Sequence, residues 1–211
     1  FGERGNTIVI EEFMVGPEVS VLAFTDGKTV VPMVSSQDHK RAYDHDEGPN
    51  TGGMGTFSPS RIYDEKLAAY AMEKIYIPTI EAMNSEGRTF KGVLYFGLMI
   101  TEDGPKVLEY NARFGDPETQ VVLPRLKTDL VDIFEAVIDE RLAEIDIEWS
   151  DNAAVCVVLA SGGYPQKYAT GYEISGLEKF DNKEGYVVFH AGTKKEDGVF
   201  KTAGGRVLGV T

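Results

Sequence analysis

The sequence has little cysteine, no long apolar run and a shortage of positive charge, and each of these excludes a class of protein. Its 211 residues contain a single cysteine, Cys156, which excludes an internal disulfide framework and a multi-cysteine zinc site. No apolar run approaches the ~20 residues that cross a bilayer, and no basic-then-apolar signal segment opens the chain. Lysine and arginine total 21 against 34 aspartates and glutamates, a formal net charge of −13, which disfavours nucleic acid and anionic membranes as partners. We therefore expect a cytoplasmic protein that binds neither.

The remaining composition is that of an ordinary globular protein, with 42% hydrophobic and 26% charged residues, and the pattern of elements is typical of an α+β fold with largely antiparallel sheets. Strands are expected at 7–12, 18–26, 29–34, 91–101, 105–110, 153–160, 186–191 and 206–210. Helices are expected over 64–87, with a kink or a new start at Pro78, and around 129–140. The acidic, irregular segment 140–151 is expected to separate a domain of residues 1–150 from a β-rich domain of residues 151–211.

The stretch 35–60 has no sustained periodicity, and a structureless segment of this length is more often functional than incidental. It contains Lys40 and Arg41, adjacent basic residues in an acidic chain that offset charge near a phosphate. Its glycine-rich part, 48–55, permits close backbone approach to a ligand. No Gly-Lys-Ser/Thr follows, so it is not a Walker loop, and its spacing is not that of the dinucleotide fingerprint. From composition alone, a mobile surface loop is an equally good interpretation.

The segment 108–119 (LEYNARFGDPET) carries the most chemical information. On a strand, Glu109, Asn111 and Arg113 point to one face because side chains alternate. Carboxylate and amide oxygens suit Mg²⁺ beside a polyphosphate, and arginine suits phosphoryl oxygens. The alternative is the solvated polar face of an edge strand, although Leu108 and the apolar run at 93–100 favour a central strand.

The residues that follow have the pattern of a helix N-terminus, with Asp116 as N-cap, Pro117 in the first position and Glu118 in the first turn. A helix N-terminus beside such a strand also presents backbone N–H groups to an anion.

The histidines and the cysteine are expected to have structural roles. His39 and His45 are interpreted as solvated loop imidazoles, His190 as a satisfied core histidine, and Cys156 as a core residue and not a nucleophile. Glu11 to Met14 end the first expected strand. They either meet a flat heterocycle through their backbone or form a strand end with one buried aromatic.

As an ordered set, several motifs make the chain resemble the phosphoribosylamine–glycine ligase family, the glycinamide ribonucleotide synthetases among the ATP-grasp enzymes. The motifs are IEEFM–GPE (10–18), SQDHKR (36–41), GPNTGGMGTFSP (48–59), LEYNARFGDPETQ (108–120), ASGGYP (160–165), HAGT (190–193) and GGRVL (204–208). The resemblance covers essentially the whole chain. GPNTGGMG and RFGDPETQ are specific to this family, whereas Glu-x-Asn is shared widely among ATP-grasp proteins.

The resemblance implies an ATP-grasp core followed by a truncated C-terminal β-rich domain, and the ATP-dependent ligation of glycine to 5-phosphoribosylamine through a glycyl phosphate. It implies that Glu109 and Asn111 bind Mg²⁺ or Mn²⁺ and that Arg113 stabilises the transferred phosphoryl group. It implies that the adenine and ribose are bound by Glu11, by the backbone at Phe13 and Met14, and by Glu18. It implies that glycine and phosphoribosylamine are held by Asp38, Lys40, Asp116 and Glu118.

Members of that family are about twice this length. The chain starts at Phe1 without a methionine and stops at Thr211 inside an expected strand. We therefore expect a fragment of a monomeric parent enzyme that does not turn over by itself. Two alternatives stay open, another ATP-grasp carboxylate–amine ligase or carboxylase, and a nucleotide-binding module without catalysis.

Overall fold

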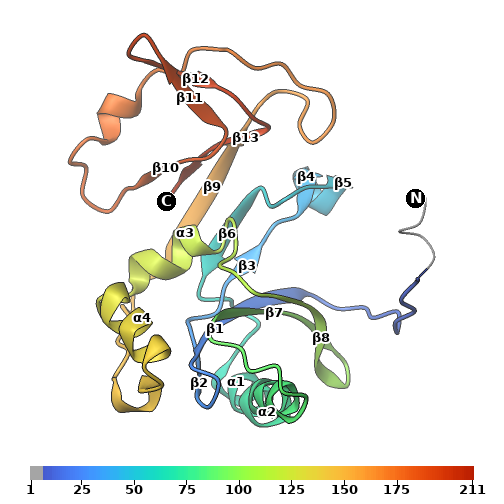
Figure 1. The fold of residues 1–211 in the computed structure, drawn as a ribbon. Helices are drawn as coiled ribbons and strands as arrows, with labels where there is room; N and C mark the ends of the chain where they lie inside the picture. Colours follow the sequence, from blue (N-terminus) through green and yellow to red (C-terminus); the bar gives the residue numbers. More distant parts are fainter. Residues whose placement is uncertain (1–6) are drawn as a thin grey trace.

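The computed structural model describes residues 7–211, and two antiparallel sheets organise them (Figure 1). The four-stranded sheet has the order β2-β1-β7-β8, and each neighbouring pair is antiparallel. Tight turns connect β1 to β2 and β7 to β8, as the glycine-containing turns at Gly27 and Gly104 predict. The bounds are β1 Glu18–Thr25, β2 Val30–Pro32, β7 Gly92–Thr101 and β8 Gly104–Asn111.

The five-stranded sheet has the order β10-β13-β9-β6-β3. Because β9 pairs with β6 on one side and with β13 on the other, this sheet contains strands from both sides of the segment 140–151, where the domain boundary stays a prediction. Its strands are β3 Gln37–Asp38, β6 Gly55–Ser58, β9 Ala154–Ala160, β10 Val188–His190 and β13 Arg206–Val210. Two separate hairpins are β4 Arg41–Tyr43 with β5 Glu47–Asn50, and β11 Thr193–Glu196 with β12 Val199–Thr202.

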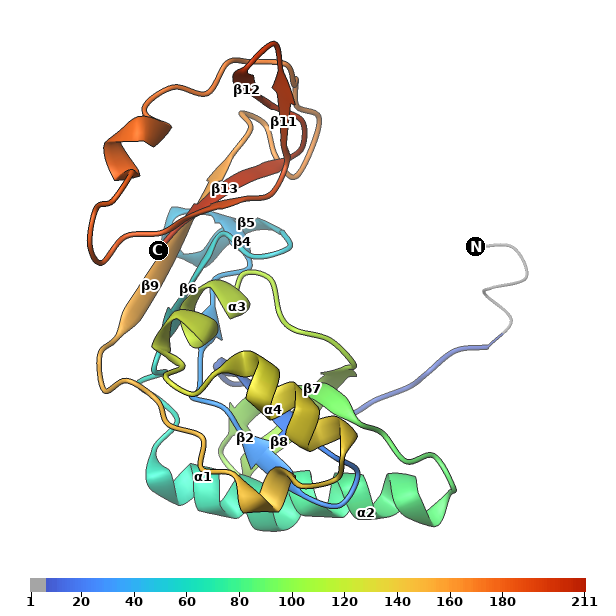
Figure 2. The same ribbon diagram turned by 60° about the vertical axis from the view of Figure 1, so that its left-hand side comes forward.

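Helices cover both faces of the four-stranded sheet (Figure 2). One core lies between the sheet and the long helix made of α1 and α2, and the other lies on the opposite face under α3 and α4. Neighbouring strand residues divide between the two cores, Val21 facing one and Leu22 the other, which is the alternation that a strand buried on both faces requires. The helices are α1 Glu65–Ala71, α2 Ile77–Ser85, α3 Thr119–Val122 and α4 Leu130–Ile138. Short 3₁₀ turns lie at Asp44–Asp46, Leu123–Arg125, Leu142–Glu144 and Leu177–Phe180.

The long helix follows the sequence pattern with one addition. A second helix begins at Ile77, directly before Pro78, which confirms the expected new start at this proline. A π-helical turn over Met72–Tyr76 joins this helix to α1. Asp64 caps the first helix and Asp129 caps α4 through their side chains. No helix in the described part of the chain has the length and apolarity needed to cross a membrane.

Several expectations about strands are wrong. Residues 7–12 form no strand and their apolar side chains are exposed, since within residues 7–211 they have no ladder partner. The stretch 35–60 is not structureless, because it contributes β3 to β6. The run 153–160 is a strand but is not fully buried, with Val155 and Val157 more than half exposed on one face. Cys156 is a core residue as expected, whereas His190 is exposed, with Nδ1 2.9 Å from Thr193 Oγ1.

Candidate active site

The predicted metal–phosphate face lies at the carboxyl end of β8. Glu109 and Asn111 lie two residues apart on this strand, and Asn111 Nδ2 donates to Glu109 Oε1 at 3.2 Å. Just beyond the strand, Arg113 Nη2 donates to Asn111 Oδ1 at 3.4 Å. The expectation of a central strand is wrong, because β8 is the edge of its sheet in the part of the chain described. The three polar groups nevertheless converge on one place.

A polar cavity of about 180 Å³ lies against these side chains. Its other walls are β3 and the residues after it, the glycine-rich stretch, and the turn that precedes α3. It brings together seven of the residues singled out from the sequence: Asp38, Lys40, Glu109, Asn111, Arg113, Asp116 and Glu118. These residues are separated by up to 80 positions in the chain, from 38 to 118, and they come from strands of both sheets and from the turn before α3, so the tertiary fold assembles them.

Glu118 forms the buried floor of this cavity. Only 4% of its surface is exposed, and its Oε1 accepts hydrogen bonds from Tyr95 Oη at 3.0 Å and from Ser20 Oγ at 3.2 Å. The hydroxyl oxygens of Tyr95 and Ser20, Oη and Oγ, also lie 2.7 Å from each other. Burial and the nearby Glu118 charge raise the pKa of the Tyr95 hydroxyl above its usual range, so that hydroxyl stays a donor to the carboxylate.

The Asp38 carboxyl titrates unusually high. Burial, followed by the charge of Glu118, raises the pKa of Asp38 from 3.8 to about 6, although the ammonium of Lys40 opposes the shift. A carboxyl with this pKa exchanges a proton close to neutral pH, which is the behaviour expected of a group that holds an amine or handles a proton.

Lys40 is held by Glu18, a residue that the family resemblance assigns to the adenine and ribose. Its Nζ lies 2.5 Å from Glu18 Oε2, at the first residue of β1. Burial lowers the pKa of Lys40, but the hydrogen bond to Glu18 and the charges of Asp38 and Glu18 outweigh it and the net shift is upward. Lys40 is therefore a fixed cation at the cavity wall.

The expectation that Asp116 caps a helix is wrong. The helix begins three residues later, at Thr119, with Glu118 in the N-cap position. Asp116 does not cap it, because both of its carboxylate oxygens have side-chain partners. Oδ1 accepts from Gln120 Nε2 at 2.9 Å, and Oδ2 lies 3.0 Å from Arg206 Nη2. Asp116 is therefore tied to the first residue of β13, in the C-terminal part of the chain.

The remaining expected nucleotide residues lie outside this cavity. Glu11, Phe13 and Met14 line a separate groove of about 380 Å³ along β8. Phe13 is 89% exposed, so the interpretation of a strand end with a buried aromatic is wrong. The neighbouring Glu12 binds Lys106, with Oε1 2.7 Å from Nζ, and this surface ion pair joins the extended segment to the strand.

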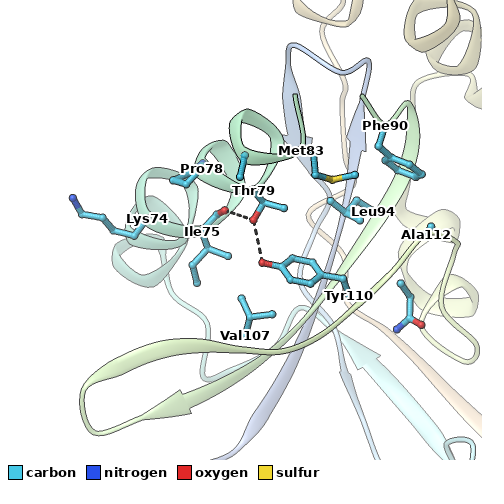
Figure 3. Close-up of a pocket in the computed structure, with 12 residues that line it drawn as sticks. Lys74, Ile75, Pro78, Thr79, Met83, Phe90, Leu94, Val107, Tyr110 and Ala112 are labelled. Atoms are coloured by element: carbon cyan, nitrogen blue, oxygen red, sulfur yellow. Dashed lines mark hydrogen bonds between the residues drawn. The ribbon is translucent and has the colours of Figure 1, made fainter. Parts of the chain in front are cut away.

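An apolar cavity of about 630 Å³ lies behind the polar strand, between the long helix and the β7–β8 hairpin (Figure 3). Tyr110, between Glu109 and Asn111, points into it, and its hydroxyl lies 3.1 Å from Thr79 Oγ1 on α2. The alternation of β8 therefore places an aromatic anchor on the helix side and Glu109 on the opposite side, whereas Asn111 at the end of the strand lines both cavities.

Two family models match most of the chain. A family model described as the ATP-grasp (A) domain of phosphoribosylglycinamide synthetase matches residues 1–119, and the model of its C domain matches residues 154–211. The chain belongs to the phosphoribosylglycinamide synthetase family. The phosphoribosylamine–glycine ligase of Halalkalibacterium halodurans is 54% identical over 208 residues, which are 99% of this chain and 48% of that protein.

Two further relatives extend the comparison. The trifunctional purine biosynthetic protein adenosine-3 of Gallus gallus is 53% identical over 212 residues, 100% of this chain and 21% of that protein. The crystal structure of the phosphoribosylamine–glycine ligase of Thermotoga maritima superposes with a TM-score of 0.78 at 35% identity, covering 94% of this chain and 48% of that one. The chain thus spans about half the length of the phosphoribosylamine–glycine ligases it matches. An N5-carboxyaminoimidazole ribonucleotide synthetase from Thermotoga maritima, 18% identical with a TM-score of 0.55, shares the fold alone.

In this family member, the donor set at β8 fits a divalent cation that keeps other ligands. Among residues 7–211, no three His, Cys, Asp or Glu side chains group closely enough to hold a metal by themselves. Glu109 and Asn111 offer one carboxylate and one amide oxygen, which is the sparse set of hard ligands that Mg²⁺ takes when phosphates and water complete its shell. The amide oxygen now faces Arg113, so a rotation of the Asn111 amide would bring it to the side of Glu109.

Sequence reasoning missed four residues that organise the polar cavity and its walls. Ser20 and Tyr95 hold the buried Glu118, and neither is marked by any local signal, because both lie in ordinary apolar strands. Tyr164 accepts from the Gly52 N–H at 3.1 Å, and Arg206 binds Asp116. These two lie within the family motifs ASGGYP and GGRVL, which is the signal that could have found them.

Proposed function

We propose that this chain supplies the nucleotide-and-substrate half of a phosphoribosylamine–glycine ligase. The reaction would join glycine to 5-phosphoribosylamine with ATP and yield glycinamide ribonucleotide, ADP and phosphate. The observation that carries the proposal is the polar cavity at the end of β8, where Glu109, Asn111 and Arg113 face Asp38 and Lys40. Membership of the family supports it, because the relatives that share half of their length with this chain carry that name.

The chemistry has two balanced steps. A glycine carboxylate oxygen attacks the γ-phosphorus of ATP, the bond to the bridging oxygen breaks, and ADP leaves with the bond's electron pair. The amine of phosphoribosylamine then attacks the acyl carbon of glycyl phosphate, phosphate departs, and the amine nitrogen loses a proton. The site must therefore hold polyphosphate, a small zwitterion and a sugar phosphate together, and such a reaction is catalysed mainly by positioning and electrostatic stabilisation.

Glu109 and Asn111 are proposed to hold Mg²⁺ or Mn²⁺. When bound, such a cation neutralises charge on the phosphate oxygens. Arg113 is proposed to donate to the transferred phosphoryl group, because its guanidinium lies next to Asn111 and arginine matches phosphoryl oxygens with paired donors.

Asp38, Lys40, Asp116 and Glu118 are proposed to hold glycine and phosphoribosylamine. Lys40 offers a fixed positive charge to a carboxylate or a phosphate. Asp38, with its pKa raised to about 6 by burial and by Glu118, can accept a hydrogen bond from a substrate amine or take its proton.

The nucleotide base is proposed to lie in the neighbouring groove. Glu11 and the backbone of Phe13 and Met14 line it, and Glu18 stands at the start of β1 where the ribose would lie between the groove and the polar cavity. A cytoplasmic, monomeric parent enzyme is part of the same proposal.

A chimera tests this function. Residues 1–211 replace the matching segment of the Halalkalibacterium halodurans ligase, and ADP release is measured with ATP, Mg²⁺, glycine and phosphoribosylamine. We expect release that needs both substrates and yields glycinamide ribonucleotide, and no release from the 211-residue chain alone.

Absence of turnover in a folded chimera would contradict the proposal. Turnover with another acceptor amine in place of phosphoribosylamine would favour a different ATP-grasp ligase. Binding of ATP with no dependence of ADP release on glycine would favour a non-catalytic module.

A further inference from the structure

Arg206 joins three segments that are far apart in the sequence. It is the first residue of β13, and its Nη1 donates to the carbonyl oxygen of Gly52 at 2.6 Å and to that of Asp116 at 2.9 Å. Its Nη2 lies 3.0 Å from Asp116 Oδ2. One guanidinium from the C domain therefore binds both the glycine-rich stretch and the turn before α3. A fork of several donors is what distinguishes arginine from lysine in such a contact.

The glycine-rich stretch is packed against this guanidinium. A Cβ at Gly52 would lie 3.1 Å from Cζ of Arg206, closer than side chains usually approach. A Cβ at Gly53 would lie 2.5 Å from Cδ of Pro117. On the other side, the Gly52 N–H donates to Tyr164 Oη at 3.1 Å. Two C-domain side chains, one donor and one acceptor, thus fix the peptide groups of Gly52.

These contacts shape one wall of the polar cavity. Gly52 and Asp116 line that cavity together with Glu109 and Arg113. The side chain of Arg206 is only 21% exposed, the lowest fraction among the side chains that form ion pairs in the described chain, whereas its partner Asp116 is 54% exposed. A displacement of this wall by an ångström is enough to reduce catalysis strongly.

We propose that Arg206 is a positioning residue. It holds Gly52 and Asp116 at the substrate wall of the cavity, so that the C domain completes a site whose reacting groups all lie in the A domain. The proposal rests on the proposed function for its kinetic consequence, and on the contacts of Arg206 for its structural one. Arg206 donates hydrogen bonds to Gly52 and Asp116 and not to the β8 residues proposed to hold the metal and phosphates. Because Asp116 is proposed to hold glycine or phosphoribosylamine, these are the substrates affected, and not ATP.

The kinetic test compares Arg206→Gln and Arg206→Lys in the chimera. We expect both variants to raise the KM of glycine or phosphoribosylamine by about tenfold to a hundredfold, as loss of a supporting contact does, and to leave the KM of ATP unchanged. Arg206→Lys keeps the charge but loses the fork. The proposal would be overturned if Arg206→Lys had the KM values of the wild type, or if both variants left the KM values of glycine and phosphoribosylamine unchanged.

A matched control is Arg141→Gln. Arg141 also pairs with an aspartate, Nη2 to Asp139 Oδ2 at 3.2 Å, but on the exposed surface after α4. Its substitution is expected to leave all KM values at their wild-type level. A general loss of stability would lower the fraction of folded enzyme, and hence kcat, but would not raise the KM of one substrate alone.

Amide hydrogen exchange on the 211-residue chain tests the contact without turnover. In Arg206→Gln we expect the Gly52 N–H to exchange about tenfold faster or more, because local opening becomes easier. The Met54 N–H donates to the His39 carbonyl oxygen at 2.7 Å, and the Met54 carbonyl oxygen accepts from the Val158 N–H at 3.0 Å. Neither bond involves Arg206, so the Met54 N–H is expected to keep its rate. Wild-type exchange at Gly52, or equal acceleration at Met54, would overturn the proposal. If the wild-type chimera releases no ADP, the proposed function fails and this measurement alone decides the role of Arg206.

Discussion

Tyr95 donates its hydroxyl to the carboxylate of Glu118, with 3.0 Å from Oη to Oε1, and both residues are buried. The pair joins the core strand β7 to the turn before α3, beneath the polar cavity. A buried carboxylate is costly unless hydrogen bonds compensate for its lost hydration. The tyrosine hydroxyl is one of the two side-chain donors that Glu118 has here, the other being Ser20.

The first prediction is that Tyr95→Phe destabilises the fold. The substitution leaves the ring in place and removes one donor from a buried acceptor, which costs about 1–3 kcal/mol in the free energy of unfolding. Urea unfolding of the 211-residue chain measures it. Tyr172→Phe, at a residue 65% exposed, is the control and is expected to change stability by less than about 0.5 kcal/mol. Equal stability of the two variants would contradict the role assigned to Tyr95.

The second prediction concerns pH and Asp38. Burial and the charge of Glu118 raise its folded pKa to about 6 from 3.8, against the opposing charge of Lys40. Because the folded state binds this proton more tightly than the unfolded state does, the proton stabilises the fold. This contribution to the free energy of unfolding is complete below pH 3.8 and is lost as the pH rises through about 6. Asp38→Asn, which cannot ionise, therefore gains up to about 3 kcal/mol in the free energy of unfolding relative to wild type between pH 4 and pH 7.

Urea unfolding of both proteins across that pH range measures the difference, and titrations common to both cancel in it. Parallel curves for wild type and Asp38→Asn would show that Asp38 has an ordinary pKa in the folded chain.

The third prediction separates crowding from backbone strain in the glycine-rich stretch. Gly53 has φ +108°, and an added Cβ would lie 2.5 Å from Pro117 Cδ. Gly171 has φ +90° and nothing within 4 Å of an added Cβ. Both Gly→Ala variants lose about 1 kcal/mol to the left-handed backbone, and Gly53→Ala is expected to lose about 1–3 kcal/mol more through overpacking. Comparable unfolding free energies for the two variants would mean that Pro117 yields without cost.

The polar face of β8 was predictable because its signals are local. The turn 102–104 between two apolar runs predicts the β7–β8 hairpin, and alternation then places Glu109 and Asn111 on one face. The caps at Asp64 and Asp129 follow from the same kind of short-range chemistry. Such features need only a few neighbouring residues, and the structure confirms them.

The features that the sequence did not predict depend on distant partners. Asp116 has the pattern of a helix cap, but the guanidinium of Arg206, 90 residues away, binds its carboxylate instead. Residues 7–12 have the composition of a strand, yet a strand needs a ladder partner and none lies beside them among residues 7–211. Glu118 has the pattern of a helix first turn, but the helix begins after it. Its carboxylate is buried, because Tyr95 and Ser20 provide donors in the core. Pairings of this range leave no local periodicity to detect.

The central claim is that the Glu109 face of β8 binds the metal and phosphates of a glycine-dependent ligase. Titration of Mg²⁺ against glycine-dependent ADP release tests it most directly, in the chimera carrying Glu109→Gln and in a control carrying Glu102→Gln in the exposed turn of the same hairpin. We predict that Glu109→Gln raises the Mg²⁺ concentration for half-maximal release by about tenfold to a hundredfold, while Glu102→Gln matches wild type. Identical Mg²⁺ curves for the two variants would contradict the claim.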